Sequence, residues 1–219
     1  MKDGDYKKKR NNLIDGLIRR GYVESDKVEK AMRKVPRHEF VPENIRDRAY
    51  VDTPQPIGEG QTISAPHMVA MMVENLDLDR GQKVLEVGGG LGYHAAVIAE
   101  VVGYEGEVYS LEYKTSLAKS AKKRVKKIGY QNIEIIKGDG SSGYEKKAPY
   151  DRISVACGAP EIPPPLMKQL LVGGKILIPI GSKFFQKLIK ATKIEEGKIE
   201  KSNLGGVRFV PLKGAYGFR

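Results

Sequence analysis

The sequence predicts an α/β fold built on a doubly wound, mostly parallel sheet, and two observations carry this prediction. Short apolar runs alternate with helical patterns from residue 81 onward, which is typical of parallel strands joined by crossover helices. In addition, the apolar run 84–87 leads into a turn with glycines at 88, 89, 90 and 92, and an alanine-rich helical segment follows. Open parallel sheets bind ligands beyond the carboxyl ends of their strands, so this turn is the expected cofactor loop.

The other elements follow from the same patterns. Strands are expected at 83–87, 107–111, 133–136, 152–156, 175–180, 188–194, 198–201 and 207–212. Helices are expected up to Gly21, over 26–35, 66–76, 92–102 and 115–128, and in a short segment ending at Leu171. The turn at 195–197 predicts a hairpin that adds antiparallel strands at one edge of the sheet.

The N-terminal part is expected to cover the sheet as a helical cap. Residues 1–10 are predicted to be a frayed basic tail, and residues 37–60 an ordered loop, because Phe40, Tyr50 and Ile57 need burial. We therefore expect a single domain over residues 1–219, in which 1–80 form the cap and 81–219 the cofactor-binding sheet and C-terminal hairpin.

Composition narrows the class of protein. The chain has 219 residues, of which 40% are hydrophobic and 30% charged, as in a soluble globular protein. No apolar run approaches the ~20 residues that span a bilayer, and no apolar segment follows the basic N-terminus to form a secretory signal. The single cysteine, Cys157, excludes an internal disulfide. We expect a cytoplasmic protein that acts as a monomer and has no membrane partner.

The spacing of the loop glycines leaves two cofactor classes open. The dinucleotide pattern G-x-G-x-x-G/A is met only from Gly90, through Gly92 and Ala95, which begins late after the strand. The pattern acidic-x-G-x-G-x-G is met from Glu86 through Gly88, and it is typical of S-adenosylmethionine-dependent methyltransferases. The spacing favours the methyl donor over NAD.

Two acidic residues stand where strands end. Glu112 stands at the end of the second strand, 24 positions beyond the first loop glycine, Gly88. In nucleotide-binding folds an acidic residue about 20 positions on binds the ribose hydroxyls. The alternative is a solvated glutamate. Asp139 lies between two glycines after the third strand, where it could bind an adenine edge or simply form a turn.

The segment before the cofactor strand offers a hydroxyl and an imidazole. Ser64 could cap the helix that begins near Pro66, or it could present its hydroxyl to a substrate, and the residues alone do not decide. His67 is more typical of a structural residue. The three histidines and Cys157 lack metal-ligand spacing, so no metal is expected.

The net charge of +11 raises the question of nucleic acid. Basic residues concentrate on one expected helix, and no aromatic residues lie among them for base stacking. A solvated outer face is therefore favoured over a nucleic-acid patch. These residues are Lys114, Lys119, Lys122, Lys123, Arg124, Lys126 and Lys127.

Taken together, these segments make the chain resemble the protein-L-isoaspartate O-methyltransferases over nearly its whole length. Thr62-Ile63-Ser64-Ala65-Pro66-His67 and Val207-Arg208-Phe209-Val210-Pro211-Leu212 are the most specific segments. One departure is Gly89, where members of the family often carry Thr or Ser. The remaining matching segments are 84–100, 138–140, 149–153, 159–163 and 173–181.

The resemblance implies a protein repair enzyme that methylates the free carboxylate of L-isoaspartyl residues, with D-aspartyl residues as a second candidate substrate. S-adenosylmethionine would be the cofactor and S-adenosylhomocysteine its product. Ser64 would be the active-site serine. The cofactor residues would be Glu86, Gly88, Gly90, Gly92, Glu112, Asp139 and Gly140, with Gly88 at the methionine portion, Glu112 at the ribose and Asp139 at the adenine. Damaged proteins would contact Thr62, Ser64, His67 and Val207.

Two rival hypotheses remain. A nucleic-acid methyltransferase fits the charge, but amine-directed enzymes usually carry Asn/Asp-Pro-Pro-aromatic after the fourth strand. Here residues 156–160 read Ala-Cys-Gly-Ala-Pro, which counts against that class. An NAD enzyme or a cofactor-binding protein would use the glycine register that starts at Gly90.

Overall fold

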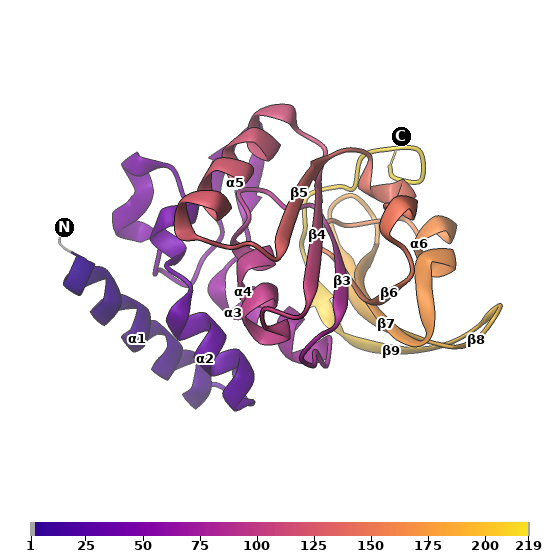
Figure 1. Ribbon diagram of the computed structural model, residues 1–219, viewed down its shortest axis with the longest axis horizontal. Helices are drawn as coiled ribbons and strands as arrows, with labels where there is room; N and C mark the ends of the chain where they lie inside the picture. Colours follow the sequence, from indigo (N-terminus) through magenta and orange to yellow (C-terminus); the bar gives the residue numbers. More distant parts are fainter. Residues whose placement is uncertain (1–2, 219) are drawn as a thin grey trace.

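The computed structural model describes residues 3–218, and its main sheet has seven strands in the order β5-β4-β3-β6-β7-β8-β9 (Figure 1). The strands from β5 to β7 are parallel, and β8 and β9 add antiparallel pairs at one edge. This confirms the predicted sheet. The strands are β3 Lys83–Val87, β4 Glu107–Glu112, β5 Ile133–Lys137, β6 Tyr150–Val155, β7 Leu170–Gly181, β8 Gln186–Glu195 and β9 Lys198–Val207.

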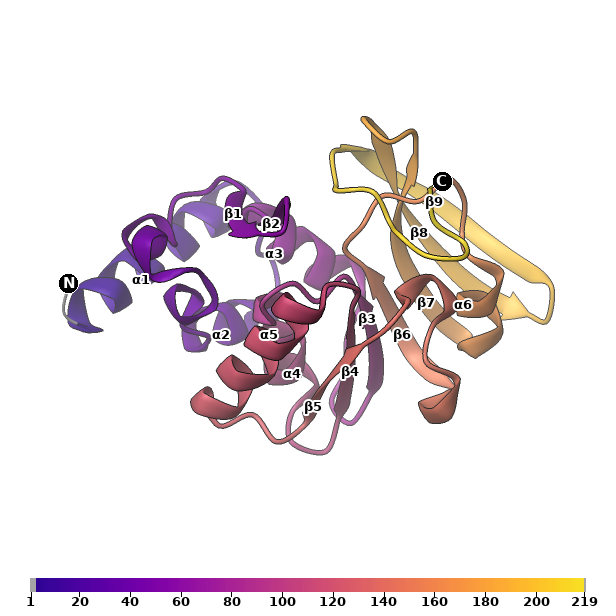
Figure 2. The same ribbon diagram turned by 90° about the horizontal axis from the view of Figure 1, so that it is seen from above.

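Helices cover the two faces of the sheet unequally. Figure 2 shows α1 to α5 on one side of the sheet and the short α6 on the other. Two 3-10 turns, η3 Gly140–Ser142 and η4 Glu145–Lys147, precede β6 in the chain. The N-terminal cap also contains a small hairpin of β1 Gln55–Gly58 and β2 Gln61–Ile63. The α-helices are α1 Asp3–Arg19, α2 Asp26–Lys34, α3 Pro66–Asn75, α4 Tyr93–Val102, α5 Thr115–Ile128 and α6 Pro164–Gln169.

Alternation along the central strands explains why both faces are buried. Val84 of β3 and Val108 of β4 pack into the larger core, with α1 to α5. Leu85 and Val87 point to the opposite face and join the smaller core, which includes Leu166 of α6. Because successive side chains of a strand alternate between faces, an apolar run such as 84–87 supplies both cores at once.

The topology places a crevice at the carboxyl end of β3. After β3 the chain builds β4 and β5 on one side, and it then crosses to the other side to add β6. The connections therefore leave β3 and β6 in opposite directions. This is the topological switch point at which open α/β sheets bind ligands.

The N-terminal tail differs from the prediction. Residues 3–10 belong to α1 instead of fraying. Tyr6 is only 8% exposed, its ring stacks on His38 with centroids 4.1 Å apart, and its hydroxyl donates to Asp47 Oδ1 at 3.3 Å. The expectation of a frayed tail was wrong for residues 3–10 because one aromatic side chain anchors an otherwise lysine-rich segment, and residues 1–2 lie outside the described part of the chain.

The loop over 37–60 is ordered, as predicted. It forms the 3-10 turns η1 Arg37–Phe40 and η2 Glu43–Arg48 and then enters β1. Phe40, Tyr50 and Ile57 are all buried, which confirms that these three side chains tie the loop to the core.

The predicted last strand at 207–212 is also wrong. β9 is longer than expected and ends at Val207, which pairs with Gln186, the first residue of β8. Beyond that point β8 offers no further partner, so residues 208–218 run as an irregular segment that we call the C-terminal strap. The strap is attached across the crevice by hydrogen bonds from Gly158 N to Val210 O (2.9 Å) and from Leu212 N to Gly158 O (2.7 Å).

Candidate active site

At several positions, the loop after β3 has a backbone conformation that only glycine adopts readily. Gly88, Gly90 and Gly92 have φ values of +90°, +56° and +93°, a region that side-chain-bearing residues rarely adopt. A Cβ on Gly88 would lie 2.6 Å from Cys157 Sγ. The loop thus brings its backbone close to the crevice, as a cofactor cradle requires.

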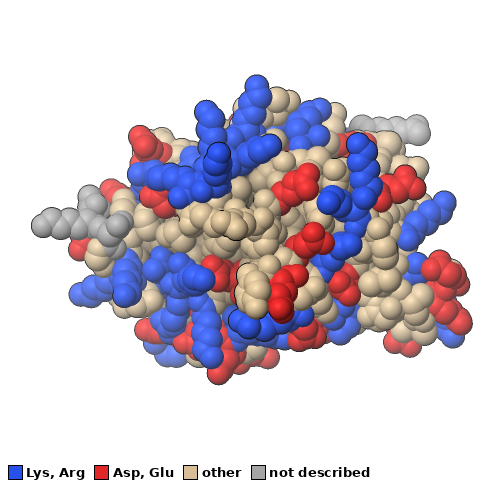
Figure 3. Space-filling model, in the orientation of Figure 1, with Lys and Arg blue, Asp and Glu red and all other residues tan. Residues whose placement is uncertain are grey.

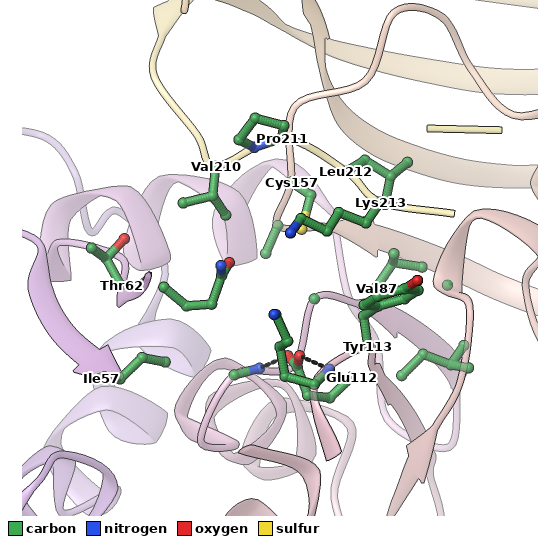
Figure 4. Close-up of a pocket in the computed structure, with 17 residues that line it drawn as sticks. Ile57, Thr62, Val87, Glu112, Tyr113, Cys157, Val210, Pro211, Leu212 and Lys213 are labelled. Carbon is green, nitrogen blue, oxygen red and sulfur yellow. Dashed lines mark hydrogen bonds between the residues drawn. The ribbon is translucent and has the colours of Figure 1, made fainter. Parts of the chain in front are cut away.

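Glu112 ends β4 beside this loop. Its carboxylate accepts hydrogen bonds from Gly90 N (2.8 Å) and from Lys114 N (2.7 Å), the dashed lines in Figure 4. Burial raises the pKa of the Glu112 carboxyl, and the two backbone donors only partly offset it. Each oxygen keeps a further lone pair, so Glu112 could accept both hydroxyls of a ribose.

A cavity of about 60 Å³ lies between the glycine loop and Glu112. Ile57, Gln61 and Thr62 of the β1–β2 hairpin line one side of it. Residues 210–213 of the strap line another side, across the cavity from Glu112 (Figure 4). The rest of the lining is Val87, Gly88, Gly90, Leu111, Glu112, Tyr113, Lys114, Gly140, Ala156 and Cys157.

Ser64 lines a second cavity of about 40 Å³. The two cavities meet, because five residues line both of them: Ile57, Thr62, Gly88, Gly90 and Ala156. Ser64 does not cap α3. The residue at the N-cap is Ala65, which makes no side-chain cap, so the helix-cap alternative is wrong. Among the residues the structure describes, no hydrogen bond engages the Ser64 hydroxyl.

A buried arginine that no sequence pattern singled out holds the backbone of Ser64. Arg37 donates from Nη2 to Ser64 O and from Nε to Ala49 O, both at 2.8 Å. Its guanidinium also lies 4.7 Å from the centre of the Tyr93 ring. Only its complete burial within a loop segment could have identified Arg37, and burial cannot be seen in a sequence.

Glu86 lies beneath the loop and outside both cavity linings. Its side chain is fully buried, Oε2 accepts from the Ser110 hydroxyl, and Oε1 lies 3.3 Å from His94 Nδ1. A Cβ on Gly89 would collide with that same Ser110 hydroxyl, which gives a physical reason for glycine at this position. Glu86 therefore supports the loop from below.

Asp139 is turned toward the strap. It accepts hydrogen bonds from Ser141 N (2.9 Å), Ser141 Oγ (2.6 Å) and Ala215 N (2.8 Å), and it packs against Gly214, where no Cβ would fit. Asp139 is not part of the cavity lining, whereas its neighbour Gly140 is. The carboxylate sits where the strap crosses the end of β5.

Two predicted substrate residues lie away from both cavities. His67 donates its backbone N–H to Asp52, and its Nδ1 also lies 2.9 Å from the same Asp52 oxygen. Val207 is buried at the end of β9. The strap instead brings Val210, three residues further on, into the lining of the larger cavity.

Cys157 is the one thiol in the lining. Burial raises its pKa to about 12, and the carboxylates of Glu112 and Glu86 act in the same direction. The thiol therefore stays protonated at neutral pH and is a poor nucleophile.

Figure 3 shows basic side chains gathered over α5, where Lys119, Lys122, Lys123 and Lys126 are exposed. Within residues 3–218, no group of three or more His, Cys, Asp or Glu side chains is placed to hold a metal ion. In the same part of the chain, no helix is long and apolar enough to cross a membrane.

A mostly parallel sheet with a glycine loop after β3 and a carboxylate at the end of β4 is typical of Rossmann-like nucleotide-binding folds, and the spacing of Glu86 and the loop glycines favours the S-adenosylmethionine-dependent methyltransferases among them. The glycine cradle, the free lone pairs of Glu112 and the largely apolar walls fit that cofactor.

Comparison with known proteins narrows the class. The family described as protein-L-isoaspartate(D-aspartate) O-methyltransferase matches residues 8–217. A protein-L-isoaspartate O-methyltransferase of Archaeoglobus fulgidus is 57% identical over 215 residues, covering 98% of this chain and 97% of the relative. One of Methanothermobacter thermautotrophicus is 54% identical over 211 residues, covering 96% and 97%.

Solved structures agree. A protein-L-isoaspartate O-methyltransferase superposes with a TM-score of 0.86 at 34% identity, covering 95% of this chain and 67% of the other. A Plasmodium falciparum protein, described as a complex of such a methyltransferase with S-adenosyl-L-homocysteine, gives 0.82 at 30% identity, covering 93% and 98%. The chain belongs to the protein-L-isoaspartate O-methyltransferase family.

Proposed function

We propose that this chain transfers the methyl group of S-adenosylmethionine to the free carboxylate of L-isoaspartyl residues in damaged proteins. Within its family, the observation that carries this proposal is the junction of the two cavities. One cavity presents a ribose-binding carboxylate, Glu112, the other presents an unengaged hydroxyl, Ser64, and the same five residues line both.

Methyl transfer to a carboxylate does not depend on acid–base catalysis by the protein. An isoaspartyl carboxylate is already ionised at neutral pH, so no general base is needed. When bound, the cofactor supplies a methyl group on a positively charged sulfur. Because opposite charges disappear as the methyl moves to a carboxylate, walls that exclude water favour the reaction. The buried side chains of Val87, Leu111 and Leu212 provide such walls.

The cofactor side is proposed to be held by the loop and two strand ends. Gly88, Gly90 and Gly92 shape the loop, Glu86 supports it from below, and Glu112 accepts the ribose hydroxyls. Gly140 lines the adenine end. Asp139 is proposed to bind adenine through the lone pairs that Ser141 and Ala215 leave free, and so to join the strap to the cofactor.

On the substrate side, Ser64 is proposed to orient one carboxylate oxygen by donating its hydroxyl hydrogen bond, without acting as a nucleophile. Thr62 lies in both linings and is placed to contact the same group. Val210 takes the position that the sequence suggested for Val207. His67 is proposed to act indirectly, since its bonds to Asp52 fix the first turn of α3 just after Ser64.

One chain forming one domain is proposed to suffice. Buried side chains of the cap, such as Leu17 and Phe40, share a core with Val84 and Val108 of the sheet. The hairpin, the glycine loop and the strap of this one chain wall the two cavities, and we propose that it acts as a monomer.

The decisive experiment compares transfer of a labelled methyl group to an isoaspartyl peptide and to its ordinary aspartyl twin. We expect base-labile label on the isoaspartyl peptide alone. A D-aspartyl peptide measured alongside decides whether the second candidate substrate is accepted. Equal labelling of the isoaspartyl and aspartyl peptides would refute the proposal.

The role of Ser64 is tested by Ser64→Ala. We expect kcat to fall by about 100-fold, as when one oriented donor to a reacting oxygen is lost, while S-adenosylhomocysteine affinity stays within about twofold. Equilibrium titration of the same preparations gives the affinity. A parallel loss of cofactor affinity would show that Ser64 only supports the fold.

A further inference from the structure

The tip of the β1–β2 hairpin has an unusual backbone. Gly58, Glu59 and Gly60 have φ values of +95°, +54° and +69° in succession. Glycine adopts this region freely, but a glutamate does not, and the short polar side chains that tolerate it best are Asn and Asp. No atom lies within 4 Å of a Cβ built on either glycine, so crowding does not explain the tip. The strain at Glu59 needs a compensating contact.

The Glu59 side chain makes that contact on a distant element. Its Oε1 accepts a hydrogen bond from Ser116 Oγ at 2.7 Å, and its Oε2 lies 3.7 Å from Lys114 Nζ. Ser116 belongs to the first turn of α5, and Lys114 is the residue before that helix. This turn contains no acidic residue of its own and has no side-chain cap, so Glu59 brings a carboxylate to the positive end of the α5 dipole.

The two ends of this contact belong to opposite halves of the active site. On the α5 side, Lys114 N donates to Glu112, which fixes the ribose carboxylate. On the hairpin side, the same short ribbon carries Thr62 in the cavity wall and leads directly to Ser64. Glu59 therefore joins the segment that bears the substrate groups to the segment that bears the cofactor groups.

We propose that Glu59 is a positioning residue that holds the β1–β2 hairpin on the N-terminus of α5 and thereby sets Thr62 and Ser64 against the cofactor. The assignment rests on the proposed function for its effect on turnover. Its effect on cofactor release can be measured whether or not methyl transfer occurs, because Ile57 and Thr62 of the hairpin wall the cofactor cavity.

Two variants separate positioning from folding. Glu59→Gly removes the carboxylate and also relieves the strained φ, so the melting temperature should hold or rise. Glu59→Gln keeps the side-chain length but removes the charge. For both, we expect S-adenosylhomocysteine to dissociate roughly three- to tenfold faster, and KM for an isoaspartyl peptide to rise by a similar factor, as for loss of a partly exposed charged hydrogen bond.

Controls identify the contact. Glu105→Gln makes the same charge change at an exposed turn before β4 and should leave both readouts unchanged. Ser116→Ala removes the hydrogen bond but keeps the carboxylate, so it should change both readouts in the same direction, and the Glu59→Gly/Ser116→Ala double variant should be no worse than Glu59→Gly alone. Wild-type release should quicken with added salt more than release from Glu59→Gln. The proposal would be overturned if both Glu59 variants kept the wild-type cofactor dissociation rate and the wild-type KM. Additive effects in the double variant would also overturn it.

Discussion

The floor and the roof of this active site are built by different means. The floor consists of the glycine loop and Glu112, at the carboxyl ends of β3 and β4, and the backbone ladders of two buried strands hold it. The roof consists of the β1–β2 hairpin and the C-terminal strap, which are held by a few isolated contacts: Glu59 for the hairpin, and Asp139 and two backbone hydrogen bonds to Gly158 for the strap. We therefore expect changes in the floor to lower cofactor affinity most and changes in the roof to act mainly on the rate of cofactor dissociation.

The largest effect is expected from the floor. Gly88→Ala places a side chain at a φ of +90° and in contact with Cys157 Sγ. Strain of about 1–3 kcal/mol adds to this overlap, so affinity for S-adenosylhomocysteine should fall by roughly a hundredfold or more. Calorimetric titration measures it.

Gly129→Ala is the matched control, because Gly129 has a φ of +99° at the end of α5 with open space around it. It should lose some stability but keep cofactor affinity. Similar affinities for Gly88→Ala and wild type would show that the loop backbone does not approach the cofactor.

The next effect is expected at Glu112. Glu112→Gln keeps the shape of the side chain but removes the negative charge of the carboxylate that accepts both ribose hydroxyls, so cofactor affinity should drop roughly ten- to hundredfold.

The pH dependence of cofactor affinity in the wild-type protein gives a second test of the role of Glu112. Since burial raises the pKa of Glu112, the carboxylate is protonated earlier than an exposed glutamate as pH falls, and cofactor affinity should decline with it. The decline should disappear in Glu112→Gln, and an unchanged profile would place the ribose elsewhere.

The smallest effect is expected from the roof. Gly214→Ala would push the strap away from Asp139, since no Cβ fits there. We expect cofactor dissociation to quicken roughly two- to fivefold, the loss of one partly exposed hydrogen bond, with little change in the rate of binding. Stopped-flow displacement measures the rate. Slower dissociation would mean that the strap hinders the cofactor instead of retaining it.

The same contrast explains what the sequence could predict. The floor could be predicted because the apolar runs of strands buried on both faces, the glycine spacing and the acidic residue that ends β4 are local signals in the sequence. Tyr6 and the strap could not, because each depends on one long-range contact that leaves no periodic pattern. Residues 208–212 were predicted as a strand because most of them are apolar, but a strand also needs a partner, and β8, which begins at Gln186, offers none beyond its pairing with Val207.

The site residues also divide into those whose positions local sequence patterns predict and those placed by contacts between distant parts of the chain. Glu112 is placed by its strand register, so its position beside the loop followed from the sequence. The orientation of Asp139 toward Ala215, the clamp of Arg37 on Ser64 and the inclusion of Val210 join residues far apart in the chain. Such contacts depend on side-chain packing between loops, which single-sequence patterns do not encode.

The Ser110 hydroxyl beneath the cofactor loop has a consequence for how this chain can vary. It occupies the space that any side chain at position 89 would need, and it is bonded to Glu86. Threonine or serine at position 89 would therefore force the hydroxyl at 110 to move and to give up its hydrogen bond to Glu86. A substitution at position 89 is thus coupled to residue 110, and the two positions are expected to tolerate change better together than singly.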